Sequence, residues 1–572
     1  MRILLYASGF TSLTQRAATD LAYRGHDLAV ALDLGGGQAG ARELRTAIDR
    51  HRPDLIIAPM LTTAIPADVW SAHTCLIVHP GPPGDRGPSS LDWAMAAGSR
   101  TWGVTVLQAV AEMDAGPVWA WEPFTIPEDV SKSSLYRGEV SDAAMVALLR
   151  AVDRYAAGEQ PAANPPGATR PYYQQDRRRI DWARDSTAAV SLALRTADSS
   201  PGVLDEIEGR GWYLFGGQVE DTLAGAPGAF VAVRDGAVCR ATADGAVWLT
   251  AARPRREPGQ GPTAKAPAAL ALAAHLDGVP EDHAPLQLAP GRQTYTTVRY
   301  TEHGPVGHLA LEFPSGALST ADCNRLLAAY HYATSRPTRV LVLGGGRDVF
   351  STGIHLGAIE AAADPAEESW QNINAIDDVV EAILATRDQV TVAALGGAAA
   401  AGGLMLAAAC DQVWARAGVT LNPHYVSMGL AGSELFTLTL PARVGAATAE
   451  HLTSQPLPVG AELARDLGLV DRVLPTTPAT FGPAVLSAAA ALAADPGFGN
   501  RLLDKHTAAY PPEVITRHRR QELDRMHRNF FGPDEPYHRL RREFLHKQRP
   551  TSTPGHLASL PATRTAAAAG AR

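Results

Sequence analysis

Short, uninterrupted apolar runs separated by helix-length segments dominate the first 155 residues of the chain. The runs cover residues 3–7, 28–33, 55–59, 75–80 and 102–110. A strand that is apolar at every position needs cover on both faces, as in a parallel sheet flanked by helices. This part of the chain, with a first helix over about 11–24, is therefore predicted to form an α/β domain with a twisted, mostly parallel sheet.

The pattern changes further along, which predicts an α/β multidomain protein. A Pro/Gly/Ala-rich stretch at residues 156–171 interrupts the alternation and is typical of a boundary loop. Short strands with Asp-Gly turns follow, then a second strand–helix alternation, then charge-dense helical sequence. The expected segments are 1–170 (Rossmann-like), 171–295 (small, β-rich and barrel-like), 296–482 (second α/β domain), 483–550 (helical) and 551–572 (disordered tail).

Length and composition exclude several classes of protein. With 572 residues the chain has room for two active sites. Its 51 Lys and Arg against 59 Asp and Glu give a net charge of −8, which argues against nucleic acid as a partner. No signal peptide, membrane-spanning run or CxxC pair is recognisable, so we expect a cytoplasmic protein that does not engage a membrane. The 18 histidines lack HExxH spacing, and no metal is expected.

A histidine at the end of an apolar run opens a loop rich in glycine and proline. His79 begins the string HPGPPGDRGPS, and Asp114 follows the run 102–110 in EMDAGP. In an open α/β sheet both residues would lie at the carboxyl edge, where ligands bind. An aspartate that orients a histidine forms a unit able to take a proton from a nucleophile and return it. For His79 alone, a packing or capping role is the simpler interpretation.

These strings resemble the catalytic domain of the formyltransferases that use 10-formyltetrahydrofolate. LIIAP, CLIVHPG and GVTVLQAVAEMDAGP carry the resemblance, and IDW (180–182) with the following Pro-Gly resembles that family's small C-terminal domain. The resemblance implies His79 and Asp114 as catalytic residues and Arg86 and Gly87 as folate-binding or coenzyme A-binding residues.

The chain departs from the formyltransferases at one catalytic position. Those enzymes have an asparagine two residues before the histidine, and Ile77 stands there in this sequence. An isoleucine side chain cannot donate a hydrogen bond to a developing oxyanion, so backbone N–H groups or His79 must stabilise it. A thiol acceptor needs less assistance than an amine, because part of it is already thiolate near neutral pH.

Two glycine clusters in the second α/β segment predict another site. FSTGIHL (350–356) and GGAAAAGGLMLAAACD (396–411) resemble the crotonase (enoyl-CoA hydratase/isomerase) family, in which two backbone N–H groups hold a thioester oxygen. The resemblance places these donors at Ile354 and Gly402, and implies CoA contacts at Gly353 and Gly403. Because Met405 replaces the first glutamate of the hydratases, a CoA thioester should be polarised without addition of water.

The string NPHYVSMGLAGSE (422–434) lies where the hydratases carry their second glutamate. It offers His424, Tyr425 and Glu434 as catalytic candidates, and their individual roles stay open. Glu434 in a largely apolar pocket would have a raised pKa suited to proton transfer. A buried ion pair or helix cap is the alternative for Glu434, and a core aromatic is the alternative for Tyr425.

Both domains on one chain resemble the HypX (HoxX) family of hydrogenase-maturation proteins, over nearly all of the sequence to about residue 560. The resemblance implies that formyl passes from 10-formyltetrahydrofolate to coenzyme A, and that formyl-CoA then yields the carbon monoxide ligand of nickel–iron hydrogenase. It also implies folate and CoA as small-molecule partners and other hydrogenase-maturation proteins as candidate macromolecular partners.

Two other functions remain open from sequence. In the first, formyl-CoA is formed and hydrolysed, so that formate is the product. In the second, the chain is a non-catalytic maturation factor that binds folate and CoA.

Overall fold

The computed structural model describes residues 1–560 and divides the chain into two compact units. One unit comprises Met1–Arg177 together with the C-terminal residues from Gln548 on. The other comprises Arg178–Lys547. The five-part division expected from the sequence is finer and stays a prediction.

The first unit is built on a six-stranded sheet in the order β2-β1-β3-β4-β5-β6. Its strands are β1 (Arg2–Ala7), β2 (Asp27–Leu32), β3 (Leu55–Ala58), β4 (Cys75–His79), β5 (Thr101–Gln108) and β6 (Val118–Thr125). The first four strands pair in parallel as predicted, whereas β5 and β6 run antiparallel. Strand β6 was missed because its sequence VWAWEPFT contains a proline, which only an outer strand tolerates.

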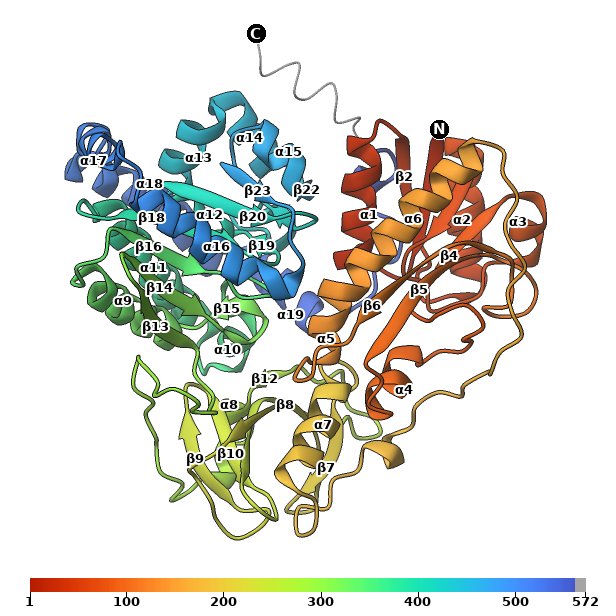
Figure 1. Cartoon of the computed structure of the whole chain (residues 1–572), viewed down its shortest axis with the longest axis horizontal. Coiled ribbons are helices and arrows are strands. Elements are labelled where there is room, and N and C mark those ends of the chain that lie inside the picture. Colours follow the sequence, from red (N-terminus) through yellow and green to blue (C-terminus); the bar gives the residue numbers. More distant parts are fainter. Residues whose placement is uncertain (561–572) are drawn as a thin grey trace. The chain divides into compact units, whose positions relative to one another are not determined.

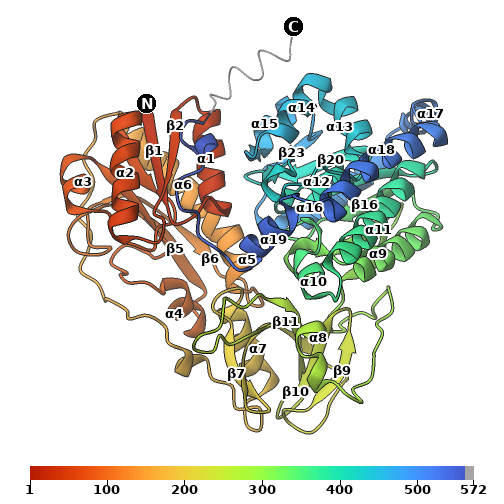
Figure 2. The same ribbon diagram turned by 180° about the vertical axis from the view of Figure 1, so that it is seen from behind.

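Helices cover both faces of this sheet, which explains its uninterrupted apolar strands. Leu4 and Tyr6 of β1 pack with Leu44 of α2 (Gly37–His51) and Val69 of α3 (Ala67–Ala72). Helices α1 (Ser12–Tyr23) and α6 (Ser141–Ala156) lie across the other face (Figure 1), and α2 is in front when the sheet is seen from behind (Figure 2). The unit also contains α4 (Ser90–Ala96), α5 (Lys132–Leu135) and the π-helical turn η1 (Tyr136–Val140).

The C-terminal segment returns to β2 of the first unit. Leu560 donates its N–H to the carbonyl of Leu28 at 2.8 Å, and the Leu32 N–H donates to Thr553 Oγ1 at 3.0 Å. Leu557 is buried. The prediction of a disordered tail is therefore wrong for residues 551–560, because backbone pairing and one buried leucine fix them. Residues 561–572 lie outside the described residues.

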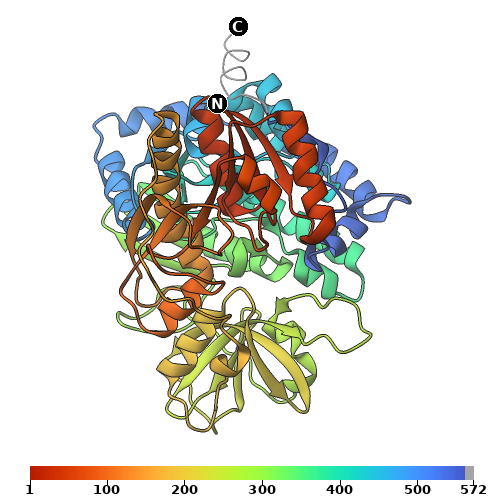
Figure 3. The ribbon, with the colours of Figure 1, turned by 90° about the vertical axis from the view of Figure 1, so that its right-hand side faces the viewer.

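The second unit begins with a six-stranded antiparallel sheet, shown by its yellow strands in Figure 3. Strands β7 to β11 have the order β7-β8-β11-β10-β9, and β12 pairs with β11. They are β7 (Val203–Ile207), β8 (Arg210–Glu220), β9 (Phe230–Arg234), β10 (Ala237–Ala241), β11 (Ala246–Pro254) and β12 (Ala266–Pro267), with α7 (Thr187–Ala197) packed on β8 and β11. Asp235 and Gly236 join β9 to β10 with φ of 50° and 78°, the conformation that a two-residue hairpin requires. The β-rich segment expected from the turn signals is confirmed.

A second α/β sheet follows in the order β13-β14-β16-β18-β20-β23, antiparallel at β13–β14 and parallel elsewhere. Its strands are β13 (Val298–His303), β14 (Val306–Leu311), β16 (Val340–Gly344), β18 (Val390–Leu395), β20 (Gln412–Arg416) and β23 (Arg472–Leu474). Leu341 and Leu343 pack under α9 (Thr320–Thr334) and α11 (Pro365–Ala385), whereas Val340 and Val342 pack on α16 (Pro478–Ala493). The strand–helix alternation predicted for this part of the chain is confirmed.

The second unit contains further helices and short strands. They are α8 (Ala268–Ala271), β15 (Ala317–Leu318), β17 (Gly353–Ile354), α10 (Leu356–Ala361), β19 (Ala399–Ala400), α12 (Gly402–Ala408), β21 (Thr420–Asn422), η5 (Val426–Met428), α13 (Phe436–Val444), α14 (Ala446–Ser454), β22 (Val459–Gly460), α15 (Ala461–Asp466), α17 (Phe498–Thr507), α18 (Pro512–Phe531) and α19 (Tyr537–Leu545). Within residues 1–560, no single helix is long and apolar enough to cross a membrane; α16 and α17 meet the test only as a pair, bent by 88°.

Candidate active sites

His79 ends β4, and both of its ring nitrogens face carboxylates. Its Nε2 lies 3.1 Å from Asp85 Oδ2, and its Nδ1 lies 3.5 Å from Asp114 Oδ2. His79 is only 5% exposed. A neutral imidazole can donate one hydrogen bond and an imidazolium two, so both carboxylates receive a proton-bearing nitrogen only when the ring is cationic. This arrangement suits a group that takes up a proton during a reaction.

Asp114 reaches His79 by a route that differs from the expected one. Because β5 is antiparallel to β4, its last residue Gln108 pairs with Leu76, and His79 pairs with Thr105 instead. The two strand ends therefore lie at opposite edges of the sheet, and the prediction that both residues follow strands ending at one carboxyl edge was wrong. The loop between β5 and β6 returns toward His79, with Asp114 in the left-handed region at φ 53°.

Asp85 is a partner of His79 that the sequence reasoning missed. It is buried, and Arg170 Nε lies 2.9 Å from its Oδ1. Although burial alone would raise the pKa of Asp85, hydrogen bonds from His79 and Ser90 and the nearby Arg170 charge hold it below its ordinary value. In the string GDRG this residue was indistinguishable from an ordinary turn aspartate.

The other residues expected at this site lie on β4 before His79 or in the loop that follows it. The Gly87 N–H donates to Asp114 Oδ2 at 3.0 Å, so this glycine helps to orient the carboxylate. Arg86 pairs with Glu112 at 2.6 Å. Ile77 lies two residues before His79 on β4, so the two side chains share one face of the sheet. Ile77 packs with the apolar cluster under α2 and α3.

The predicted thioester site brings together β17 and the beginning of α12. A Cβ added to Gly353, which has φ of 80°, would lie 3.2 Å from the Gly402 nitrogen. A Cβ added to Gly403 would lie 2.3 Å from the Ser351 carbonyl oxygen. These glycines therefore allow the backbone at Ile354 to approach the first amides of α12, as two convergent N–H donors require.

Glu434 lies directly against Gly402. A Cβ on Gly402 would be 1.9 Å from Glu434 Oε1. Tyr425 donates its O–H to Glu434 Oε2 at 2.8 Å, and the Ser433 N–H donates to the same oxygen at 3.3 Å. Among residues 1–560, no Lys, Arg or His side chain lies within 4.0 Å of this carboxylate. Glu434 therefore forms no buried ion pair with any of these residues.

The pKa of Glu434 is raised to about 8, first by burial and then by the charge of Asp377. The sequence predicted that the pKa of Glu434 would be raised, but the apolar surroundings account for only part of the increase, because the Asp377 charge adds to it. Two further buried carboxyls, Asp377 of α11 and Glu522 of α18, lie nearby, and burial raises their pKa values to about 7 and about 8. Sequence reasoning missed both, because each lies in a charge-dense helix where carboxylates are ordinarily solvated.

The remaining candidates of the second site occupy less direct positions. Tyr425 is buried, and burial with the nearby Glu434 charge raises its pKa well above 10. His424 is half-buried and precedes Tyr425, and its predicted role stays a prediction. Met405 is fully buried in α12. Among residues 1–560, no group of three or more His, Cys, Asp or Glu side chains is arranged to hold a metal ion.

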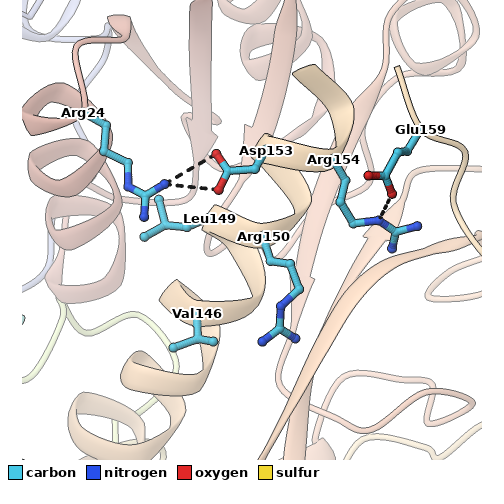
Figure 4. Close-up of a pocket in the computed structure, with 7 residues that line it drawn as sticks. All are labelled: Arg24, Val146, Leu149, Arg150, Asp153, Arg154 and Glu159. Atoms are coloured by element: carbon cyan, nitrogen blue, oxygen red, sulfur yellow. Dashed lines mark hydrogen bonds and ion pairs between the residues drawn. The ribbon is translucent and has the colours of Figure 1, made fainter. Parts of the chain in front are cut away.

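A surface groove of about 490 Å³ lies along α6 (Figure 4). Four of its charged side chains pair with one another, Arg24 with Asp153 at 3.3 Å and Arg154 with Glu159 at 2.7 Å, and Arg150 pairs with Glu122 at 3.1 Å. None of the candidate catalytic residues lines it. The groove is therefore best described as a solvated helix face.

Family models match three consecutive parts of the chain. Residues 8–152 match the formyl transferase model, residues 173–261 match the formyl transferase C-terminal domain, and residues 304–550 match the enoyl-CoA hydratase/isomerase model. Together with the sheets described above, these matches confirm the expected fold class.

Relatives and solved structures extend the similarity over almost the whole chain. The hydrogenase maturation factor HoxX of Bradyrhizobium diazoefficiens is 45% identical over 97% of this chain and 96% of its own length. The crystal structure of HypX from Aquifex aeolicus in complex with tetrahydrofolic acid is 39% identical, with a TM-score of 0.93 over 98% of both chains. Methionyl-tRNA formyltransferase of Variovorax paradoxus is 27% identical over 37% of this chain and 67% of its own length.

Proposed function

Because this chain belongs to the HypX/HoxX family of hydrogenase maturation factors, we propose that it transfers formyl from 10-formyltetrahydrofolate to coenzyme A and then releases carbon monoxide from formyl-CoA. The formyl transferase matches and the tetrahydrofolate in the related HypX structure support folate as the donor. The enoyl-CoA hydratase/isomerase match supports CoA as the acceptor. The observation that carries the second step is Glu434, bonded to Tyr425 and pressed against Gly402.

The residues of the first site fit formyl transfer to a thiol. His79 accepts the thiol proton as the sulfur attacks the formyl carbon, and later returns it to the folate nitrogen that leaves. Asp85 and Asp114 lie on opposite ring nitrogens and stabilise the cationic imidazole formed in between. A C–S bond forms and a C–N bond breaks, so the transfer needs no oxidant or reductant.

The residues of the second site fit the removal of the formyl hydrogen. The N–H groups of Ile354 and Gly402 hold the formyl oxygen, while the Glu434 carboxylate removes the hydrogen as a proton. The electron pair of the C–H bond stays on carbon, and the C–S bond breaks with its pair on sulfur. Carbon monoxide and a thiolate result, and the proton on Glu434 is available to the thiolate, so atoms and electrons balance. Tyr425 holds Glu434 in place through its 2.8 Å hydrogen bond.

The substitution at Met405 supports loss of carbon monoxide over hydration. A thioether cannot activate water, and this side chain is fully buried where the hydratases carry a carboxylate. With one proton-transferring carboxylate instead of two, the site can abstract a proton but lacks the pair that adds water across a double bond.

The decisive experiment supplies the protein with 10-formyltetrahydrofolate and CoA beside deoxyhaemoglobin. We expect the carbonyl-haem spectrum to appear, and we expect Glu434→Gln to abolish it while tetrahydrofolate is still released. Formate without carbonyl-haem would instead favour the hydrolytic alternative. If neither product forms and His79→Ala leaves hydrogenase maturation unchanged, the chain acts as a non-catalytic folate-binding and CoA-binding factor.

A further inference from the structure

The turn that carries Glu434 is strained. Glu434 and the next residue, Leu435, both adopt the left-handed region, with φ of 61° and 56°. Residues other than glycine are strained in this region, because the Cβ approaches the backbone. Two of them in succession persist only where the surrounding structure holds the turn in place. Leu435 is also completely buried, so the turn cannot relax toward solvent.

Two buried carboxyls from different helices bind the backbone of this turn. Asp377 of α11 accepts the Glu434 N–H at 2.8 Å and the Ser433 O–H at 2.9 Å. Glu522 of α18 accepts the N–H groups of Leu435 and Thr437, each at 2.8 Å. Carboxyl groups of two different helices thus accept hydrogen bonds from the N–H groups of this turn.

These carboxyls are unusual choices for a merely structural task. Asp377 and Glu522 are 0% and 1% exposed, and burying a carboxyl opposes folding in its charged form. Arg519 of α18 has its Nε 3.7 Å from Asp377 Oδ2. The same arginine also pairs with Asp378 at 2.7 Å and Glu381 at 3.2 Å. An amide side chain has a single accepting oxygen, so a glutamine at position 522 could not accept both the Leu435 and Thr437 N–H groups, which bond to different oxygens of Glu522.

We infer that Asp377 and Glu522 are positioning residues for the proton-transfer step: they hold the left-handed turn and keep the Glu434 carboxyl beside Gly402. The inference rests on the proposed function of the second site. Neither residue touches the reacting atoms, and each acts through the backbone of residues 433–437. When ionised, Asp377 also places a negative charge beside Glu434, and this charge raises the pKa of Glu434.

The titratable groups around Glu434 determine how its pKa changes when the charge of a neighbouring residue is removed. They are Tyr425, Asp377 of α11, Glu522 of α18 and the Cys323 thiol of α9. Of these, Tyr425 and Cys323 have pKa values raised well above their ordinary ones, so both stay neutral near pH 8. Neutralising Asp377 therefore removes a repelling charge, and the pKa of Glu434 must fall.

The test compares wild type, Asp377→Asn and the matched control Asp378→Asn, which also loses a partner of Arg519. The carboxylic acid C=O infrared band of Glu434, identified by its loss in Glu434→Gln, is titrated with pH in each protein. We expect its midpoint to move to lower pH by about half a unit or more in Asp377→Asn, and to stay in place in Asp378→Asn. This readout does not depend on turnover, so it remains decisive even if no carbon monoxide is formed.

Activity supplies the second readout. With formyl-CoA as substrate, Asp377→Asn and Glu522→Gln should each lower kcat about tenfold or more, because misplacing a reacting group is costly, with KM nearly unchanged. Asp378→Asn should retain the wild-type kcat. If the infrared midpoint and kcat of Asp377→Asn both equal those of wild type, Asp377 has no positioning role and the inference is overturned. A lower melting temperature with an unmoved midpoint and kcat would likewise reduce both residues to structural ones.

Discussion

Tyr425 donates its phenolic O–H to Glu434 Oε2 at 2.8 Å inside the second site. The bond stabilises the ionised carboxylate, so it opposes the effect of burial on the pKa of Glu434. Tyr425 itself stays protonated, because burial raises its pKa well above 10. The pair is thus one donor and one base, which is the minimum that proton abstraction from a formyl thioester requires.

Removing that hydroxyl should impair only the second step. In Tyr425→Phe, we expect carbon monoxide formation from formyl-CoA to fall about 10- to 100-fold. The rise of rate with pH should also move to higher pH, since Glu434 loses a bond that lowers its pKa. Carbonyl-haem absorbance between pH 6 and 10 measures both effects. The control is Tyr330→Phe. Tyr330 is another buried tyrosine; it lies in α9, and its hydroxyl is hydrogen-bonded to Thr386 Oγ1 at 2.6 Å. An equal loss of activity in this variant would point to general destabilisation.

The pH dependence of the wild type should identify the base. With a pKa raised to about 8, Glu434 is mostly protonated at pH 7 and ionises as the pH rises through 8. If the carboxylate abstracts the proton, kcat for formyl-CoA breakdown increases across that range. A kcat that instead declines above pH 8 would assign the acid form to catalysis and would require another base.

Space at the oxyanion position provides a steric test. The Cβ of Gly402→Ala would lie 1.9 Å from Glu434 Oε1, so either the carboxylate or the first turn of α12 must move. We expect carbon monoxide formation to fall about 100-fold or more, while tetrahydrofolate release continues. Gly499→Ala is the control, since nothing lies within 4 Å of its added Cβ. Unchanged kinetics in Gly402→Ala would exclude this amide from the site.

Neutralising either aspartate of the first site should slow formyl transfer, whereas neutralising a neighbouring surface carboxylate should not. Asp85→Asn and Asp114→Asn are each expected to slow tetrahydrofolate release about 10- to 1,000-fold, because each removes a carboxylate from one nitrogen of His79. Glu112→Gln, at an exposed position of the same loop, should have little effect. Wild-type activity in Asp85→Asn would leave Asp114 as the sole partner that matters.

The buried carboxyls should make stability depend on pH in an uncommon direction. Folding raises the pKa of Glu434 from 4.5 to about 8, so the folded state binds its proton more tightly than the unfolded state does. The resulting stability is complete below pH 4.5 and is lost as pH rises toward 8. At pH 8.5, the free energy of unfolding of Glu434→Gln should therefore exceed that of wild type by about 1–3 kcal/mol, measured by denaturant unfolding. At pH 4.5 the two proteins should be equally stable. Equal curves at both pH values would contradict the buried charge.

Periodicity predicted most of the architecture, and the family motifs supplied the candidate residues of both sites, whose roles stay predictions. Buried strands must be continuously apolar, and backbone donors require glycine where a Cβ would collide, as at Gly402. The direction of β5 could not be read this way, because an antiparallel strand between covered faces has the same composition as a parallel one. Asp85, Asp377 and Glu522 were equally hidden, since a carboxylate in a turn or a charged helix reveals its burial only when distant segments pack on it.

The course of the chain has a further consequence for engineering this protein. Because Gln548 and the residues after it rejoin Met1–Arg177, the unit Arg178–Lys547 is an insertion within the first unit, and one cut cannot release either unit whole. Strand β2 is one of the two edge strands of its sheet, and Leu560 occupies part of its open hydrogen-bonding side. Fragments that stop at Lys547 would present that side to neighbouring molecules and invite strand-to-strand aggregation, so separate production of the first unit calls for a splice of residues 548–560 onto it.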